Sequence, residues 1–336
     1  MILFLIFLIP VTASGQSGLA GAPGSWSRLG NSARSVAVGN AVIADTSFET
    51  AGFQSPALPA LRRDRFTEVS SFSPGLDRQM HALYLTHPVG PAGAISYGLM
   101  YFSHGAIDIR NNNGEKTGSV SPWEAIGLVN FSLGLKRLPV TIGIGVKYRM
   151  SWLFEDVATA SGFGIDAGAV WKTPVRNLTA AFVIQDMNAQ YTWDTKDLYD
   201  EDGNTTIDYF PLRYRLGLSY VIQEGLVING EWERWSWKND VREFSVSNDP
   251  FPVTSVATRK DQEVTGSLFR LGTLWTPVRH LTFMTGLDRI ASGESLRWSA
   301  GFRIDYPWIG PYLDFAVVAD QQAPQTLFVL SAGYRF

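Results

Sequence analysis

The densest group of oxygen ligands in the sequence lies in the acidic stretch from Asp194 to Asp208. Within it, Asp200, Asp202 and Asn204 occupy alternate positions, a spacing typical of the start of a Ca²⁺-binding loop. The glycine of this stretch comes earlier than in an EF-hand, and no Glu closes the loop. A solvated acidic loop is the simpler interpretation and a calcium site is the alternative, so no firm metal site is predicted.

Residues that could carry catalysis do not gather in the sequence. The four histidines are scattered over different segments: His81, His87, His104 and His280. No G-x-S-x-G turn offers a nucleophile, and the absence of Cys excludes disulfides, thiolate metal sites and thiol nucleophiles. The glycines at 162, 164 and 168 have the wrong spacing for a nucleotide loop. We therefore predict no enzymatic activity and no cofactor, and the net charge of -3 indicates no nucleic-acid partner.

A larger set of charged side chains alternates with apolar residues along the chain. Its members are Lys147, Arg149, Arg213, Arg215, Glu231, Glu233, Arg297 and Arg303. Side chains at alternate positions of a strand share one face, so all of these charges are expected opposite an apolar face. The simpler interpretation is an ion-paired network inside a lumen, and the alternatives are a polar path or a site for an anionic ligand.

The elements that position these charges are long strands with a period of two. From Val140 to Trp152 every second residue is apolar, and the residues between are polar or glycine. This segment exceeds the roughly 5–6 residues of an ordinary strand and fits the roughly 9–11 of a tilted membrane strand. The pattern recurs at 162–171, 212–222 and 296–304.

About 14 such segments follow one another after residue 64, and their connections alternate in length. Their centres lie near residues 69, 84, 98, 129, 146, 167, 182, 216, 231, 269, 285, 300, 316 and 331. Short connections carry Pro or Gly, whereas longer polar ones fall at 104–122, 188–208 and 239–262. This asymmetry predicts an all-β fold, a transmembrane antiparallel β-barrel over residues 65–336, in the lipid of a bacterial outer membrane.

Aromatic residues support this prediction, because Trp and Tyr settle at membrane interfaces. They make up 13% of the sequence, with 11 Trp, and they cluster at strand ends. Trp232, Trp235 and Trp237 crowd one strand end, either as part of an interface girdle or as the mouth of a site for a hydrophobic ligand. The last segment ends on an aromatic residue, Phe336, as expected where the final strand closes a barrel.

The first 64 residues do not have the pattern of membrane strands. Residues 1–15 contain a short apolar run followed by small residues, which predicts a cleaved signal peptide. Residues 16–64 are rich in Gly, Ser, Ala and Pro, and we expect them to form a plug or hatch segment inside the lumen. Ser55, Pro56 and Ala57 form the predicted turn of this plug.

The N-terminal motifs resemble those of the PorV/PorQ branch of the FadL-like outer-membrane proteins. The likeness rests on Ala33–Ala41, on Ala44-Asp45 and on Ser55-Pro56-Ala57-Leu58, with Ser55 and Asn40 where the family usually has Asn and Gly. Later short matches around Asn113–Gly118, Gly164–Ala169 and Pro211–Gly217 keep the family's order. The resemblance implies a 14-stranded barrel, which agrees with the number of alternating segments.

The resemblance implies two functions, which remain alternatives. PorV/PorQ relatives are accessory components of type IX secretion and surface attachment, with secretion-system subunits and signal-domain cargo as partners. FadL relatives are passive transporters that admit hydrophobic small molecules past an N-terminal hatch and through an opening in the barrel wall. Because the inward positions are polar, the sequence favours the secretion role, and a purely structural barrel is a third possibility.

Overall fold

The computed structural model describes residues 19, 21–155, 158–194, 205–246, 255–306, 310–320 and 326–336. The predicted signal peptide and the possible calcium ligands Asp200, Asp202 and Asn204 lie outside these residues. Within them, no helix is long and apolar enough to cross a membrane.

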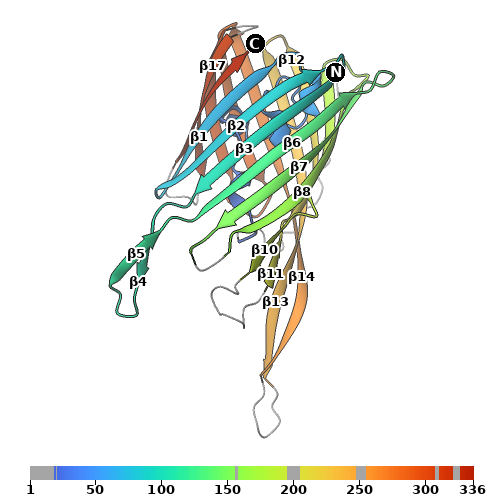
Figure 1. The fold of residues 1–336 in the computed structure, drawn as a ribbon. Helices are drawn as coiled ribbons and strands as arrows, with labels where there is room; N and C mark the ends of the chain where they lie inside the picture. Colours follow the sequence, from blue (N-terminus) through green and yellow to red (C-terminus); the bar gives the residue numbers. More distant parts are fainter. Residues whose placement is uncertain are drawn as a thin grey trace.

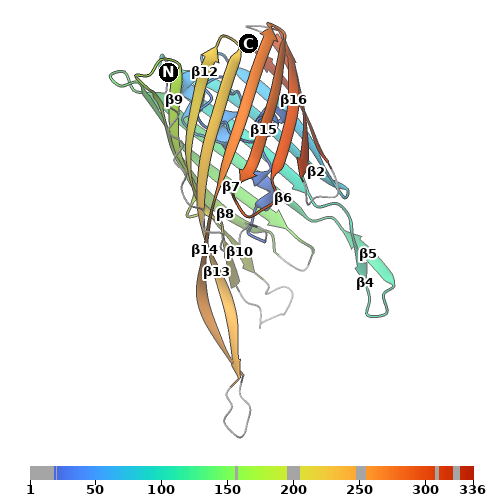
Figure 2. The same cartoon turned by 180° about the vertical axis from the view of Figure 1, so that it is seen from behind.

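Fourteen strands form a closed antiparallel barrel in the described part of the chain (Figure 1; Figure 2). They are β1 (Phe66–Gly75), β2 (Arg78–Val89), β3 (Gly93–Ser103), β6 (Trp123–Gly134), β7 (Val140–Trp152), β8 (Ala160–Lys172), β9 (Leu178–Met187), β12 (Leu212–Gln223), β13 (Leu226–Val246), β14 (Ser255–Val278), β15 (Leu281–Ile290), β16 (Arg297–Asp305), β17 (Gly310–Asp320) and β18 (Leu327–Arg335). The ring closes where β1 pairs with β18, from Phe66↔Arg335 to Ser73↔Phe328. The predicted fold class is therefore confirmed, and each predicted centre falls within one of these strands.

Two of the three long connections contain strands of their own at one end of the barrel. The first holds the hairpin of β4 (Ile107–Arg110) and β5 (Lys116–Val120), and the second holds β10 (Gln190–Asp194) and β11 (Thr205–Tyr209). By the rule that long connections are extracellular, this end is the extracellular one.

The third long connection differs from the expected loop. β13 and β14 pair without interruption from Leu226↔Trp275 to Val246↔Ser255, so most of 239–262 is a hairpin that projects beyond the barrel (Figure 1). Beyond the barrel, a pair of strands no longer separates lipid from a lumen. Its sequence therefore need not alternate, and the period of two that marks the barrel strands is absent there.

The barrel wall is apolar outside and polar inside. On β7, Ile142, Ile144 and Val146 are exposed on the outer face, whereas Lys147 and Arg149 are buried on the inner face. Water would disfavour such a continuous apolar outer surface, and hydrocarbon would disfavour the charges if they faced outward. The closed barrel with this wall places the protein in the bacterial outer membrane, as predicted.

Residues 21–64, which we call the luminal segment, lie inside the barrel (Figure 1; Figure 2). The segment forms η1 (Ser25–Arg28), α1 (Ala33–Ala37), η2 (Ala51–Phe53) and η3 (Leu58–Leu61). It bonds to several sides of the wall: Ala33 N donates to Ser331 Oγ on β18 at 2.8 Å, and Gln185 Nε2 on β9 donates to Phe53 O at 2.9 Å.

Glycines on the inner wall make room for this segment. Gly143 on β7 and Gly168 on β8 are register partners, and the predicted turn Ser55-Pro56-Ala57 lies against both. A Cβ atom on Gly143 would lie 2.1 Å from the carbonyl oxygen of Pro56, too close for any side chain. The glycine-rich inner face of these strands therefore reflects close approach of a second backbone.

Candidate functional site

The first group of inward charges converges on Asp186 of β9. Arg213 Nη2 lies 2.7 Å from Asp186 Oδ2, Arg149 Nη2 contacts Oδ1, and Lys147 Nζ lies 3.4 Å from Oδ1. Lys147 also pairs with Asp166 at 2.7 Å. Three cations on β7 and β12 thus share one buried carboxylate.

A β-bulge turns Asp186 into the lumen. The register between β8 and β9 shifts there, and Asp186 has φ +62°, a left-handed conformation that Asp tolerates better than most residues. Gln185 and Asp186 are both buried, although neighbouring residues of a regular strand face opposite sides. Sequence reasoning missed Asp186 because it broke the alternation that identified the other inward charges.

The second group lies on β12, β13, β14 and β15. Arg270 Nη1 lies 2.8 Å from both Glu231 Oε1 and Glu233 Oε2, and its Nε lies 2.8 Å from Asp288 Oδ1. Arg215 pairs with Glu231 at 2.5 Å and donates from Nη1 to Gln54 Oε1 of the luminal segment at 2.6 Å. The predicted residues Arg215, Glu231 and Glu233 therefore lie together.

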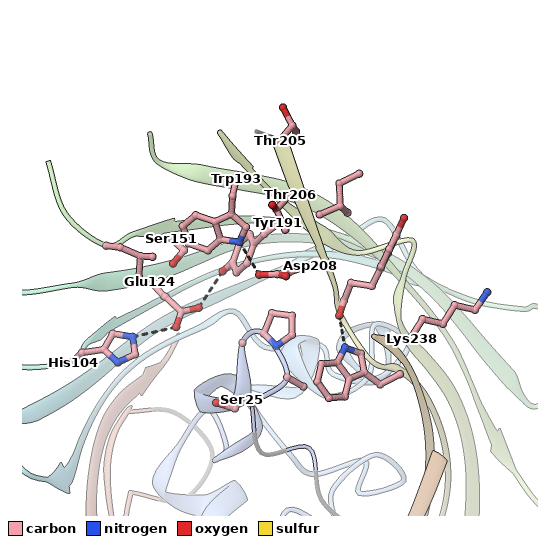
Figure 3. Close-up of a pocket in the computed structure, with 18 residues that line it drawn as sticks. Ser25, His104, Glu124, Ser151, Tyr191, Trp193, Thr205, Thr206, Asp208 and Lys238 are labelled. Carbon is pink, nitrogen blue, oxygen red and sulfur yellow. Dashed lines mark hydrogen bonds and ion pairs between the residues drawn. The ribbon is translucent and has the colours of Figure 1, made fainter. Parts of the chain in front are cut away.

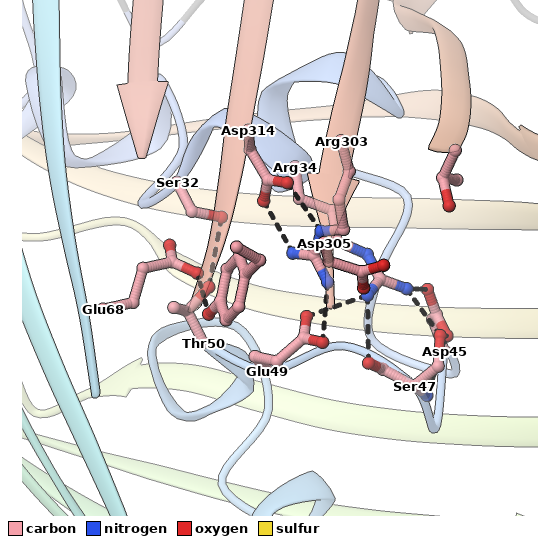
Figure 4. Close-up of polar contacts among 12 residues, drawn as sticks. Ser32, Arg34, Asp45, Ser47, Glu49, Thr50, Glu68, Arg303, Asp305 and Asp314 are labelled. Atoms are coloured by element: carbon pink, nitrogen blue, oxygen red, sulfur yellow. Dashed lines mark hydrogen bonds and ion pairs between the residues drawn. The ribbon is translucent and has the colours of Figure 1, made fainter. Parts of the chain in front are cut away.

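The third group ties the luminal segment to β16 and β17 (Figure 4). Arg303 forms two bonds of 2.6 Å with Asp314 and reaches Glu49 Oε1 at 2.8 Å. Glu49 Oε2 in turn accepts from Arg34 Nη1 at 2.8 Å, and Arg34 also pairs with Asp45 at 2.9 Å. Sequence reasoning singled out Arg303 alone, because Glu49, Arg34 and Asp45 belong to the luminal segment, which lacks the strand period.

Arg297 lies apart from these groups. Its Nε pairs with Asp320 at 2.8 Å, and its side chain is partly exposed. The eight predicted inward residues are thus all engaged in ion pairs. Gln185 links the first two groups through hydrogen bonds to Asp166 and Arg215, whereas the pairs of Arg303 and Arg297 lie elsewhere. Among the described residues, no group of three His, Asp or Glu side chains could hold a metal ion.

The ion pairs of Glu49, which lies outside the membrane-spanning strands, predict a pH dependence. Burial opposes ionisation of Glu49, but Arg303, Arg34 and Arg62 outweigh it and hold the pKa of this carboxyl well below its ordinary value of 4.5. A lowered pKa stabilises the folded protein fully above pH 4.5, and this stabilisation is lost as the pH falls towards the folded-state pKa. We expect Glu49→Gln to lower the thermal midpoint at pH 7 and to have a smaller effect near pH 3. A difference between the two proteins that stays constant from pH 7 to pH 3 would contradict this assignment.

A cavity of about 670 Å³, which we call the mouth cavity, opens at the extracellular end (Figure 3). Aromatic side chains dominate one part of its lining: Tyr191, Trp193, Tyr209 and Trp237. Trp193 Nε1 donates to Asp208 at 2.8 Å, and Trp237 Nε1 donates to the carbonyl of Tyr209 at 2.9 Å. These bonds satisfy the polar atoms of the indoles and leave their ring faces to line the space.

A polar group adjoins these aromatic rings in the mouth cavity (Figure 3). Glu124 accepts from Tyr191 at 3.2 Å and lies 3.2 Å from His104 Nε2. Burial and the charge of Glu124 raise the pKa of Tyr191, so the phenol keeps its proton and donates. The lining thus combines aromatic ring faces with polar side chains, so it can hold a small molecule that has an apolar body and a polar end.

Of the three tryptophans singled out in the sequence, two face this end of the lumen. Trp237 lines the mouth cavity, and Trp235 is buried and lines a second cavity of about 320 Å³ together with Leu19 and Leu268. Trp232 precedes Trp235 by three residues on β13. Because side chains alternate along a strand, it faces the other side of the wall.

Below the mouth, the luminal segment and the charge clusters occupy the lumen beside the cavity at Trp235. The two further voids found there have volumes of about 20 Å³ and 10 Å³, which is space for roughly one water molecule each. The Phe210 ring separates the two levels, since it packs on Tyr191 at 4.9 Å and on the Arg149 guanidinium at 4.3 Å. Within the described part of the chain, the luminal segment and the charge clusters thus lie across the lumen below these cavities.

No protein-family model and no curated protein matches this sequence. Among solved structures, the toluene transporter TodX of Pseudomonas putida is similar with a TM-score of 0.62 and 12% identity, over 91% of this chain and 98% of that chain. The toluene transporter TbuX of Ralstonia pickettii follows with 0.60 and 14%, over 91% and 98%. A FadL homologue of Pseudomonas aeruginosa has 0.59 and 12%, over 90% and 98%.

The chain has a FadL-like barrel fold. At 12–14% identity the likeness is one of fold. It supports the likeness to FadL-like outer-membrane proteins that the sequence motifs indicated. The narrower assignment to the PorV/PorQ branch stays a prediction from the N-terminal motifs.

Proposed function

We propose that the protein is a passive channel that admits hydrophobic small molecules through the outer membrane. The observation that carries this proposal is the aromatic mouth cavity at the extracellular end of a FadL-like barrel. Its volume of about 670 Å³ lies within the range of about 300–1,000 Å³ that is usual for small-molecule sites. Toluene transporters share the fold, which supports an apolar substrate here.

An occupied lumen fits this function if the luminal segment moves during passage. The segment occupies the space between the mouth cavity and the short-turn end, and hydrogen bonds and ion pairs rather than covalent bonds hold it. A substrate in the mouth cavity lies beside Pro23, Gly24 and Ser25, which belong to this segment. Binding there can thus affect the seating of the segment directly.

We expect a strain that lacks the protein to take up radiolabelled toluene more slowly, and plasmid-borne protein to restore the rate. Trp193→Ala in the mouth cavity should lower the initial rate roughly twofold to tenfold, as expected for an aromatic contact of about 0.5–1.5 kcal/mol. Trp275→Ala is the matched control, because this indole is half-exposed on the outer wall. Equal uptake by the deletion strain and its parent, for toluene and for a long alkane, would refute the function.

The accessory role in type IX secretion predicts a different phenotype in the same deletion strain. Cargo with a C-terminal signal domain would accumulate in the periplasm, while toluene uptake would be normal. Fractionation of the two strains therefore decides between the functions. The shared fold and the mouth cavity favour uptake.

A further inference from the structure

The void of about 20 Å³ in the middle of the barrel has an unusual lining. It lies between the luminal segment and the wall, and its volume is enough for one sphere of the size of a water molecule or a halide ion. No carboxylate lines it. Six basic side chains do: Arg28, Lys147, Arg149, Arg213, Arg215 and Arg270.

Arg149 has donors that the protein does not satisfy. Its side chain is 1% exposed, and its Nη2 bonds to Asp186. Its Nε and Nη1 are buried without a hydrogen-bond partner. A buried charged donor without an acceptor is costly, so an acceptor other than a protein atom is expected beside them.

The charges around the void do not balance. Five carboxylates pair with the five wall cations, and none of them lines the void: Asp166, Asp186, Glu231, Glu233 and Asp288. Arg28 forms no ion pair among the described residues, and its guanidinium donates only to the carbonyls of Pro23 and Leu19. Burial and repulsion by Arg213 lower the pKa of Arg28 to about 10. One positive charge is thus left over on the side of the luminal segment.

We propose that this void binds one small monovalent anion, which bridges Arg28 of the luminal segment to Arg149 and Arg213 of the wall. A halide ion, or one carboxylate oxygen of an amphipathic molecule, has the required charge and size. Either would accept from the free donors of Arg149 and neutralise the excess charge. The bound anion would add a contact that holds the segment in the lumen, whether or not the protein transports hydrophobic molecules.

Bromide tests the site directly, because its anomalous scattering identifies it. Crystals of the full-length protein in sodium bromide should show one anomalous peak within hydrogen-bond distance of Arg149. The thermal midpoint should rise by about 2 °C for each tenfold increase in bromide above the dissociation constant. Sodium sulfate at equal ionic strength measures the general salt effect.

Variants separate the site from general electrostatics. Arg149→Met and Arg28→Gln should abolish or weaken the bromide-dependent rise, whichever of them folds better. Arg297→Met is the matched control, since this arginine pairs with Asp320 away from the void, and it should keep the full rise.

A second probe, 4-bromobenzoate, distinguishes the two sources of the anion. A bromine peak in the neighbouring cavity beside Trp235, together with displacement of bromide from the void, would show that a carboxylate is the preferred occupant. A bromide peak that 4-bromobenzoate does not displace would show that the site takes free halide. Absence of any peak in the void with both probes, with equal thermal midpoints in bromide and sulfate, would overturn the proposal.

Discussion

Replacing Asp186 by Asn is expected to lower the free energy of unfolding by about 3–5 kcal/mol, the usual cost of removing one partner of a buried ion pair. Lys147, Arg149 and Arg213 converge on this one carboxylate, and all three are buried. Asn keeps the size of the side chain but removes the charge that compensates them. Urea unfolding of the reconstituted barrel, followed by Trp fluorescence, measures the difference.

The matched control for this prediction is Asp108→Asn. Asp108 also pairs with two cations, Arg110 and Lys116, but on the β4–β5 hairpin where these side chains are exposed. Exposed pairs contribute about 0–1 kcal/mol, so this change should have little effect. If Asp186→Asn costs no more than the control, the lumen must be wet enough to solvate the three cations, and the account of a closed interior would be wrong.

Gly143→Val is expected to release the luminal segment and to open the barrel. The first side-chain atom at this position would meet the backbone of Pro56 at 2.1 Å, so the turn of the segment must move. Overpacking of this kind costs about 1–3 kcal/mol, which shifts the equilibrium between the seated and released segment by roughly 5- to 150-fold. A barrel of this width without its segment would hold water. Planar-bilayer recordings should then show open-channel current where the unaltered protein shows little.

Gly127→Val on β6 is the control for Gly143→Val. Nothing lies within 4 Å of a Cβ atom at Gly127, and its strand neighbours Ile126 and Leu128 are the buried ones. Valine should therefore be tolerated there without change in conductance. Equal conductance of Gly143→Val and Gly127→Val, with both barrels folded, would show that the seating of the luminal segment does not depend on the space at Gly143.

The barrel and its polarity could be predicted from the sequence, because strand alternation is a local property. The residues of 140–152 alternate whatever lies beside them, and lipid outside requires the apolar set to face outward. The inward positions of Lys147, Arg149, Arg213 and Arg215 follow from the same period. The short turns and long connections likewise follow from local composition.

The partners of these charges depended on the tertiary structure. Arg149 meets Asp186 only because a bulge in β9 turns that carboxylate inward, and the period of two contains no signal for a bulge. Arg303 meets Glu49 because the luminal segment follows one particular path through the barrel. Strand register and the path of the segment are set by packing between residues that are distant in sequence.

The sequence by itself thus determined a 14-stranded outer-membrane barrel with a charged interior. Only the tertiary structure decided how that interior is divided. The inward charges that favoured a secretion role form ion pairs below the mouth, in clusters at Asp186, Glu231 and Glu49, except for Arg297, which pairs with Asp320. The aromatic rings of Tyr191 and Trp193 on β10 and of Trp237 on β13 gather above these clusters. They meet because the connection between β9 and β12 and the β13–β14 hairpin both extend beyond the wall and line one cavity. Alternation tells which face a residue is on, but only the closed barrel brings faces of different strands together.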